Sequence, residues 1–382
     1  MSRTLRMLVV SCLAILPGLA MPGPATAANG VAVYVGTYTG ATSRGIYRFT
    51  LDTDTGAPGA PVLVAETTNP SFLALHPNGR VLYAVNEVDE AGGVSGGRVS
   101  AFAIDARSGQ LTLLNQQASE GAAPCHLVVD RGGRHVLVAN YNGGNVAVLP
   151  ILADGRLGTA THVTRHAGSG PNAARQQRPH AHGVHFDPTE RIVVAPDLGA
   201  DRVFVHRYDP EAGTLTEVGA GRGAAGAGPR HAAFGAGGRV LYAINELTST
   251  ISVFDVDAAA GRLTLAQDVT TLPVPATVAN TTAELVVSPD GRHLYGSNRG
   301  HDSVAVFEID GATGRLTPRG HVAAGGKTPR HFAIDPTGRW MLVAHQGDDS
   351  IAVFRLDAQT GVPVATAHRI HVGRPVCLLP AP

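Results

Sequence analysis

Residue types that can transfer protons and bind negative charge occur at a few defined places in this chain. His182, Arg230, Glu246 and Arg299 each lie beside one end of a short apolar stretch. A carboxylate or a neutral imidazole can take a proton from water, and a guanidinium group can stabilise negative charge that develops on an oxygen atom. These residues are far apart in the sequence, so they can act together only if the fold brings them together.

The elements that would position them belong to a repeated unit. A polar residue, an alternating apolar stretch and an acidic turn that closes on glycine recur seven times, at 45–56, 98–109, 145–155, 202–213, 250–261, 303–314 and 350–361. The closing glycines are on average about 51 residues apart, and one seventh of the 355 residues after position 27 is the same length. The repeats therefore fill the chain and leave no room for a second domain.

Each repeat contains a second pair of strands. A short apolar strand, a glycine-containing turn and another strand come before the stretches described above, as in 71–86 and 284–298. Four short strands joined by tight turns are typical of a propeller blade, and no window shows the sustained i, i+3, i+4 pattern of a helix. The stretch 375–379 has no partner after it and 31–37 has no inner strand before it. We therefore predict an all-β protein, a seven-bladed β-propeller with four-stranded blades in which the N- and C-terminal strands close one blade.

Charge and the N-terminal residues limit the class of protein. The 30 Lys and Arg residues balance the 30 Asp and Glu residues, so the basic excess of a nucleic-acid-binding protein is absent. Arg3 and Arg6 precede the apolar run 8–19 and an Ala-Thr-Ala step, which is the layout of a secretory signal peptide. We predict a signal peptide at 1–27 and a propeller domain at 28–382, in a periplasmic or secreted protein. After cleavage we expect a monomer without membrane attachment.

One face of the predicted ring collects the residues that differ between blades. In an antiparallel blade, the innermost strand begins on the face where the second strand ends. Residues at these starts are Cys125, His126, His180, His182, Arg230, His231, Glu284, Arg330 and His331, and those at the ends include Glu87, Asn140, Tyr141, Glu246 and Arg299. The insertion 164–179 opens on this face as well. Repeats that share a scaffold but diverge at one end predict a site at that end.

Other interpretations of these residues are structural or metal-binding. Arg230 and Glu246 fall in one blade and could form only a structural ion pair. His180 and His182 share one face of a strand and could bind a metal, but no carboxylate partner or paired-cysteine motif is evident, so we predict neither metal nor cofactor. Cys125 and Cys377 are predicted to be free thiols because a blade separates them.

An ordered set of short strings covers nearly the whole chain after position 27. It comprises Val35-Gly36-Thr37-Tyr38-Thr39, Asn69-Pro70-Ser71, Pro124-Cys125-His126, Ala139-Asn140-Tyr141, Pro179-His180-Ala181-His182, Gly228-Pro229-Arg230-His231, Asn245-Glu246-Leu247 and Ser297-Asn298-Arg299-Gly300. In this set the chain resembles the propeller-type lactonases typified by 6-phosphogluconolactonase, to which carboxymuconate lactonizing enzymes are related. The resemblance implies a catalytic group of His182, Arg230, Glu246 and Arg299.

The resemblance also implies a reaction. We expect a hydrolase that opens a sugar lactone, 6-phosphogluconolactone or a related aldonolactone. Glu246 or His182 would activate water, and the two arginines would stabilise the oxyanion and bind an anionic substituent. Predicted substrate-binding residues are His126, Asn140, Tyr141, His180, Glu284, Arg330 and His331. The alternatives are a muconate cycloisomerase and an exported, non-catalytic propeller that binds a ligand or partner.

Overall fold

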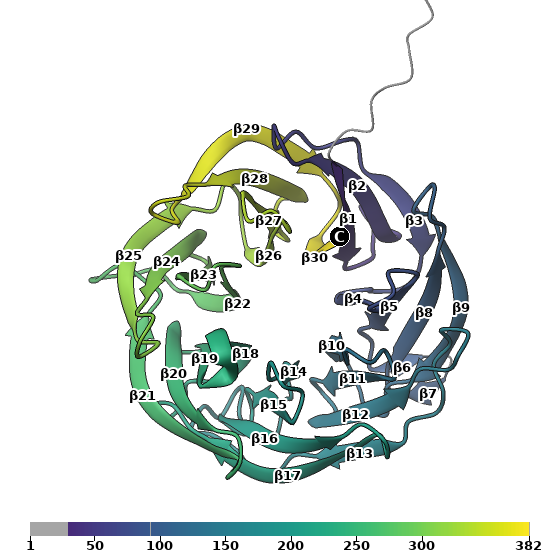
Figure 1. Cartoon of the computed structure of the whole chain (residues 1–382), viewed down its shortest axis with the longest axis horizontal. Coiled ribbons are helices and arrows are strands. Elements are labelled where there is room, and N and C mark those ends of the chain that lie inside the picture. The colour runs from purple at the N-terminus through teal and green to yellow at the C-terminus, as the bar shows by residue number, and fades with distance from the viewer. Residues whose placement is uncertain (1–29, 92, 382) are drawn as a thin grey trace, which may run out of the picture.

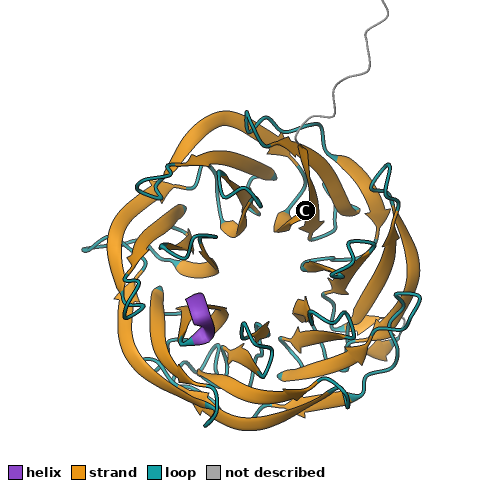
Figure 2. Cartoon of the chain, in the orientation of Figure 1, coloured by secondary structure: helices purple, strands orange, loops and turns teal. Residues whose placement is uncertain are grey.

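The computed structural model describes residues 30–91 and 93–381, which form seven antiparallel four-stranded sheets arranged as a ring (Figure 1). The seven-bladed propeller predicted from the repeats is confirmed. Almost all of the described chain is strand, turn or loop, with one short 3-10 helix, η1 (Ala236–Gly238), between the first two strands of a blade (Figure 2). The predicted signal peptide, 1–27, lies outside the described residues.

The blades are numbered from the one that contains the N-terminal strand, and each is given from its innermost to its outermost strand. Blade 1 consists of β30 (Pro375–Ala381), β1 (Gly30–Thr37), β2 (Gly45–Asp52) and β3 (Val62–Glu66). Blade 2 consists of β4 (Leu73–Leu75), β5 (Val81–Asn86), β8 (Arg98–Ile104) and β9 (Leu111–Ala118), with the small hairpin β6 (Glu90–Ala91) and β7 (Val94–Ser95) between β5 and β8. Blade 3 consists of β10 (Pro124–Val129), β11 (His135–Asn140), β12 (Asn145–Pro150) and β13 (His162–Arg165).

The other four blades follow the same order around the ring. Blade 4 consists of β14 (His185–Phe186), β15 (Ile192–Asp197), β16 (Arg202–Asp209) and β17 (Thr214–Gly221). Blade 5 consists of β18 (Pro229–Phe234), β19 (Val240–Asn245), β20 (Thr250–Asp257) and β21 (Arg262–Thr270). Blade 6 consists of β22 (Thr281–Val287), β23 (His293–Arg299), β24 (Ser303–Ile309) and β25 (Leu316–Ala323), and blade 7 of β26 (Pro329–Ile334), β27 (Trp340–His345), β28 (Ser350–Leu356) and β29 (Pro363–His371).

The two ends of the described chain close the ring in blade 1. β1 pairs antiparallel with β30, with Tyr34 opposite Leu379 and Val35 opposite Leu378. The last strand therefore becomes the innermost strand of the first blade, as predicted, and the closed sheet leaves no open edge between the first and last repeats. Within the described residues, no helix has the length and apolar character needed to cross a membrane.

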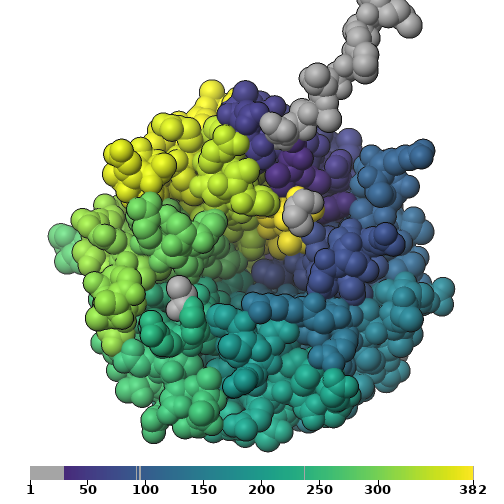
Figure 3. Space-filling model, viewed as in Figure 1, coloured from purple at the N-terminus to yellow at the C-terminus, as the bar shows by residue number. Residues whose placement is uncertain are grey.

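Apolar side chains of neighbouring blades pack against each other to form the core. One cluster joins Val33 and Phe49 of blade 1 to Leu342 and Val353 of blade 7, and others span each successive pair of blades. A four-stranded sheet cannot cover both of its faces alone, so this packing between blades supplies the burial that holds the ring together. The innermost strands surround a central hollow, which the space-filling view shows on the face that carries η1 (Figure 3).

The glycines that close the seven predicted repeats have a specific backbone role. All seven have φ between 62° and 86°, in the left-handed region where a side chain is strained. The carbonyl oxygens of four of them also accept a hydrogen bond from a buried tyrosine of the preceding blade; for example, the Tyr295 hydroxyl donates to Gly361 at 2.7 Å. The turn glycines therefore fix both the ends of the blades and the contacts between them.

Candidate active site

Bulges at the start of three innermost strands deliver side chains to the site. In blades 3, 5 and 7 the pairing of the first two strands shifts register at Cys125, Arg230 and Arg330. A bulged residue leaves the regular ladder, and bulges of this kind re-aim a side chain and often occur next to active sites. The proline on the N-terminal side and the histidine on the C-terminal side of each bulge are the same in all three blades.

Glu246, which follows β19 directly, is the centre of a buried ion cluster. Its Oε2 lies 2.9 Å from Nη2 of Arg299 and 3.2 Å from Nε of Arg230, and its Oε1 lies 2.8 Å from Nη2 of Arg175. Glu246 is 5% exposed and Arg230 is 3% exposed. The fold thus places three guanidinium groups from blades 5 and 6 and from the β13–β14 connection around one carboxylate.

His182 completes the group predicted to be catalytic. Its Nε2 lies 3.9 Å from Oε2 of Glu246, and its Nδ1 lies 3.6 Å from the sulfur of Cys125. The edge of its ring meets Tyr141, with 5.0 Å between the ring centres. His182, Arg230, Glu246 and Arg299 therefore lie together, on blades 4, 5 and 6.

Burial and the arginine charges set the protonation states in this cluster. Burial lowers the pKa of His182 well below its usual range, and the charge of Arg230 acts in the same direction, so the imidazole is neutral near pH 7. Burial alone would favour the neutral acid of Glu246, but the charges of Arg299 and Arg230 outweigh it and hold the pKa of Glu246 well below its usual range. Burial also lowers the pKa of Arg299 to about 10, although the charge of Glu246 acts in the opposite direction. Because this value is still well above 7, the guanidinium group remains charged at neutral pH.

A cavity of about 250 Å³ opens beside the cluster. Its lining residues are Glu87, Cys125, Tyr141, Arg175, His182, Glu246, Arg299 and Arg330. The wall therefore consists mainly of charged groups and groups that donate or accept hydrogen bonds. A cavity with convergent polar groups and shifted pKa values has the properties of a small-molecule site.

Four of the predicted substrate-binding residues pack beside the cluster around Glu246: His126, His180, Glu284 and His331. Nδ1 of His231 lies 3.1 Å from both carboxylate oxygens of Glu284, and Nε2 of His331 lies 3.3 Å from one of them. The His126 ring contacts the ring of His231 at 5.0 Å. His180 stacks on Tyr141 and contacts the backbone oxygen of that residue.

Asn140 occupies a structural position in the ladder. It is fully buried, and its side-chain amide donates to the carbonyl of Ser119 at 2.7 Å. The corresponding Asn298 of blade 6 donates to the carbonyl of Thr271 in the same way. Since side chains alternate along a strand, the residue after each asparagine, Tyr141 or Arg299, is the one that reaches the cavity.

Three cavity residues were not among the predicted catalytic or substrate-binding residues: Arg175, Glu87 and Cys125, the last of which lies at the bulge of β10. Arg175 comes from the 164–179 insertion, which the sequence places on this face, but its contact with Glu246 depends on the folded path of that connection. The connection is held by Gln176, whose amide donates to the carbonyl of Leu198 and to Oδ1 of Asp201 at 2.9 Å. Glu87 was noted at the end of its strand; the signal that could have identified it is that Asn86-Glu87 repeats the Asn-Glu step of blade 5.

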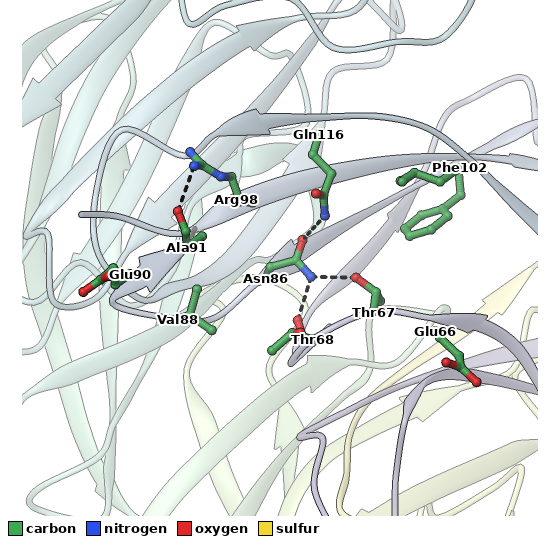
Figure 4. A pocket seen from close by; sticks show the side chains of 11 residues that line it. Glu66, Thr67, Thr68, Asn86, Val88, Glu90, Ala91, Arg98, Phe102 and Gln116 are labelled. Atoms are coloured by element: carbon green, nitrogen blue, oxygen red, sulfur yellow. Dashed lines mark hydrogen bonds between the residues drawn. The ribbon is translucent and has the colours of Figure 1, made fainter. Parts of the chain in front are cut away.

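A larger cavity of about 640 Å³ lies elsewhere, between blades 1 and 2 (Figure 4). Its polar groups are bonded mainly to one another: the amide of Asn86 donates to Thr67 and to the carbonyl of Thr68, and Arg98 donates to the carbonyl of Ala91. None of the predicted catalytic or substrate-binding residues lines this cavity. Five of the predicted site residues instead line the smaller cavity.

Two further observations concern metals and thiols. Across residues 30–91 and 93–381, no three His, Cys, Asp or Glu side chains are arranged to hold a metal ion. Cys125 and Cys377 are both buried free thiols, as predicted. Burial raises the pKa of each thiol, so neither is a reactive thiolate at neutral pH.

The ring of blades and the charged cavity define a propeller with a polar small-molecule site. The family model described as lactonase, 7-bladed beta-propeller matches residues 32–380. The chain is 40% identical to a 6-phosphogluconolactonase of Bacillus subtilis over 299 residues, which covers 78% of this chain and 83% of that protein. The crystal structure of a periplasmic gluconolactonase of Pseudomonas aeruginosa is similar with a TM-score of 0.86 and 36% identity, covering 92% of this chain and 99% of that one. This protein belongs to the seven-bladed β-propeller lactonase family.

Proposed function

We propose that the protein is a hydrolase that opens a sugar lactone, 6-phosphogluconolactone or a related aldonolactone, to the corresponding acid. The observation that carries this proposal is the cluster in which Arg230 and Arg299 meet one buried carboxylate at a small polar cavity. Membership of the lactonase family supports the same reaction, and relatives carry the names 6-phosphogluconolactonase and gluconolactonase.

The catalytic group that we propose is the one predicted from the sequence. Water attack on the lactone carbonyl places negative charge on the carbonyl oxygen, and Arg230 or Arg299 can stabilise that charge through charge-assisted hydrogen bonds. Glu246 holds the guanidinium groups in place, because each makes an ion pair with it. His182 is neutral and lies at the cavity wall, where it can exchange hydrogen bonds with the substrate hydroxyls.

The charge of the cavity supports an anionic substrate. Arg175, Arg299 and Arg330 line it and Arg230 lies beside it, whereas Glu87 and Glu246 are the carboxylates in the lining. The four guanidinium groups therefore exceed the two carboxylates by two positive charges. A phosphate monoester carries a charge of roughly −1.5 to −2 at pH 7, which would match this excess. Tyr141 and Arg330 are the predicted substrate-binding residues that line the cavity, and we propose that they contact the substrate.

The test is to measure ring opening by proton release with 6-phosphogluconolactone and with unphosphorylated gluconolactone. We expect turnover above the spontaneous rate, with the higher kcat/KM for the phosphorylated lactone. A higher kcat/KM for gluconolactone would keep the reaction class but contradict the charge argument. A folded protein that opens neither lactone would contradict the proposed function and favour a binding module.

We also propose that the protein is an exported monomer. The arrangement of residues 1–27 as a signal peptide supports export, and a structural relative is named a periplasmic gluconolactonase. Expression of the full chain with cell fractionation, followed by N-terminal sequencing and light scattering, tests both points. A chain recovered uncleaved from the cytoplasm would contradict export, and a dimer mass would contradict the monomer.

A further inference from the structure

The cavity contains two carboxylates at equivalent places in the repeat. Glu87 follows β5 of blade 2 directly, and Glu246 follows β19 of blade 5 directly; an asparagine ends the strand in both cases. Both side chains line the same cavity. Two carboxylates in one site commonly have different acid–base roles when their surroundings differ. The contacts of each carboxylate therefore decide which of them can accept a proton.

The surroundings of the two carboxylates differ in charge. Glu246 has three arginine ion pairs, at 2.8, 2.9 and 3.2 Å. Among the described residues, no arginine or lysine makes an ion pair with Glu87. Its carboxylate oxygens instead each lie 2.9 Å from the hydroxyl of Tyr38, and the hydroxyl of Ser71 donates to Oε2. Guanidinium groups at contact distance favour the ionised carboxylate, so the three ion pairs of Glu246 oppose its protonation.

Tyr38 holds Glu87 in a fixed orientation. Its hydroxyl accepts a hydrogen bond from Nη2 of Arg330 at 2.8 Å and donates to Glu87. The guanidinium groups of Arg330 and Arg374 lie over the Tyr38 ring, 5.2 and 5.4 Å from its centre. Burial raises the pKa of Tyr38, so the hydroxyl keeps the proton that it donates to Glu87. A base held in this way meets the geometric requirement for general-base catalysis.

His182 is the other group that could take the proton. It is neutral, but burial and the charge of Arg230 disfavour the imidazolium that proton transfer would create. Its Nε2 faces Glu246 at 3.9 Å, within the group of arginines that surrounds that carboxylate. By contrast, no arginine or lysine among the described residues makes an ion pair with Glu87.

We infer that Glu87 is the general base of the lactone hydrolysis and that Glu246 positions the arginines; the inference rests on the proposed function. Glu87 accepts a proton from water as the water oxygen bonds to the lactone carbonyl carbon, and the carbonyl π electrons move to the oxygen that the arginines stabilise. When that intermediate collapses, the bond between the carbonyl carbon and the ring oxygen breaks. The ring oxygen leaves with the proton returned by Glu87, which yields the hydroxy acid and regenerates the carboxylate.

The experiment compares Glu87→Gln with the parent protein and with Glu90→Gln, an exposed glutamate of the same connection. Turnover of 6-phosphogluconolactone is measured together with calorimetric binding of 6-phosphogluconate. We expect kcat of Glu87→Gln to fall about 10²–10⁴-fold, the usual contribution of a general base. Binding of 6-phosphogluconate should stay within about threefold of the parent value, and Glu90→Gln should match the parent in both measurements.

Rescue by an added carboxylate gives a second and independent readout. Formate should restore part of the activity of Glu87→Ala, because it can occupy the vacated space, but it should not restore Glu246→Ala, where the arginines have lost their anchor. Glu87→Gln with more than a tenth of the parent kcat would overturn the inference, as would an equal loss of turnover and binding. If the parent protein opens no lactone, the proposed function fails; if the parent is active and Glu87→Gln is too, only the inference fails.

Discussion

Arg175 and Glu246 are 71 residues apart in the sequence, yet Nη2 of Arg175 donates to Oε1 of Glu246 at 2.8 Å. The same Nη2 donates to the Tyr141 hydroxyl at 3.0 Å, so Arg175 joins blades 3 and 5 across the cavity wall. Burial acts to lower the pKa of Arg175, but its hydrogen bonds to Tyr141 and Glu246 outweigh this and raise it. The connection before β14 therefore contributes a permanent positive charge to the site.

Arg175→Gln tests this contribution. A hydrogen bond to a charged group contributes about 1.5–3 kcal/mol, so we expect kcat/KM for 6-phosphogluconolactone to fall about 10–100-fold. The matched control is Arg178→Gln in the same connection, whose guanidinium group donates to the backbone of Asn142 and not to the cluster. Equal kcat/KM values for the two variants would contradict a role for Arg175 in the site.

Glu246→Gln should lower stability as well as turnover. Arg230 is buried and Arg299 nearly so, and removal of their carboxylate leaves buried positive charge without a partner. Breaking a buried ion pair in this way costs about 3–5 kcal/mol. Urea unfolding followed by circular dichroism measures the change, with Glu211→Gln, which breaks an exposed pair with Arg134, as the control. A midpoint for Glu246→Gln equal to that of the control would show that the cluster does not stabilise the fold.

Gly56→Ala should weaken the closure between blades 7 and 1. Gly56 has φ of 72°, and a Cβ there would collide with the ring of Trp340, whose Nε1 donates to the carbonyl of Thr53 at 2.9 Å. Strain and overpacking together cost about 2–4 kcal/mol. Because Trp340 is the only tryptophan, its fluorescence during urea unfolding reports directly on the contact between blades 7 and 1. Gly311→Ala, where a Cβ meets no atom within 4 Å, should unfold like the parent, and identical midpoints for both variants would contradict the prediction.

His206 should make stability depend on pH. It is fully buried on β16, and burial lowers its pKa to about 3. Below the unfolded pKa of about 6.5, the unfolded chain binds a proton that the folded protein excludes, so this histidine reduces stability as pH falls from about 6.5 toward 3. Between pH 7.5 and pH 5, the parent should lose roughly 2 kcal/mol more than His206→Leu. Parallel urea midpoints for the two proteins across this range would contradict the assigned pKa.

Much of the fold could be predicted from local patterns. The seven glycines that close the repeats mark turns that require a left-handed backbone, and each such turn is specified by a few adjacent residues. The apolar alternation around them defines strands in the same local way, and the unpaired stretches at the two ends predicted the closure of blade 1. Because the repeats share one topology, the face on which His182, Arg230, Glu246 and Arg299 meet followed from strand order alone.

The contacts between side chains within the site could not be predicted from the sequence in the same way. Strand order placed Glu87 and Glu246 on one face, but it could not show that one carboxylate meets three guanidinium groups and the other meets two hydroxyls. Arg175 lies in an irregular connection without a repeat partner, so its position depends on contacts such as those of Gln176. Asn140 was predicted to bind substrate because it ends a strand beside the site, but the direction of its amide depends on the position of the Ser119 carbonyl in the ladder.

The amino-acid sequence by itself determined the seven-bladed propeller and its closure, because turns and strands are encoded by neighbouring residues. It also determined which polar and charged groups lie at one face of the ring. Only the tertiary structure decided which of those groups touch and what charge each carries. Ion pairs and pKa values change over distances of a few ångströms, and those distances arise from packing between segments that are remote in the chain.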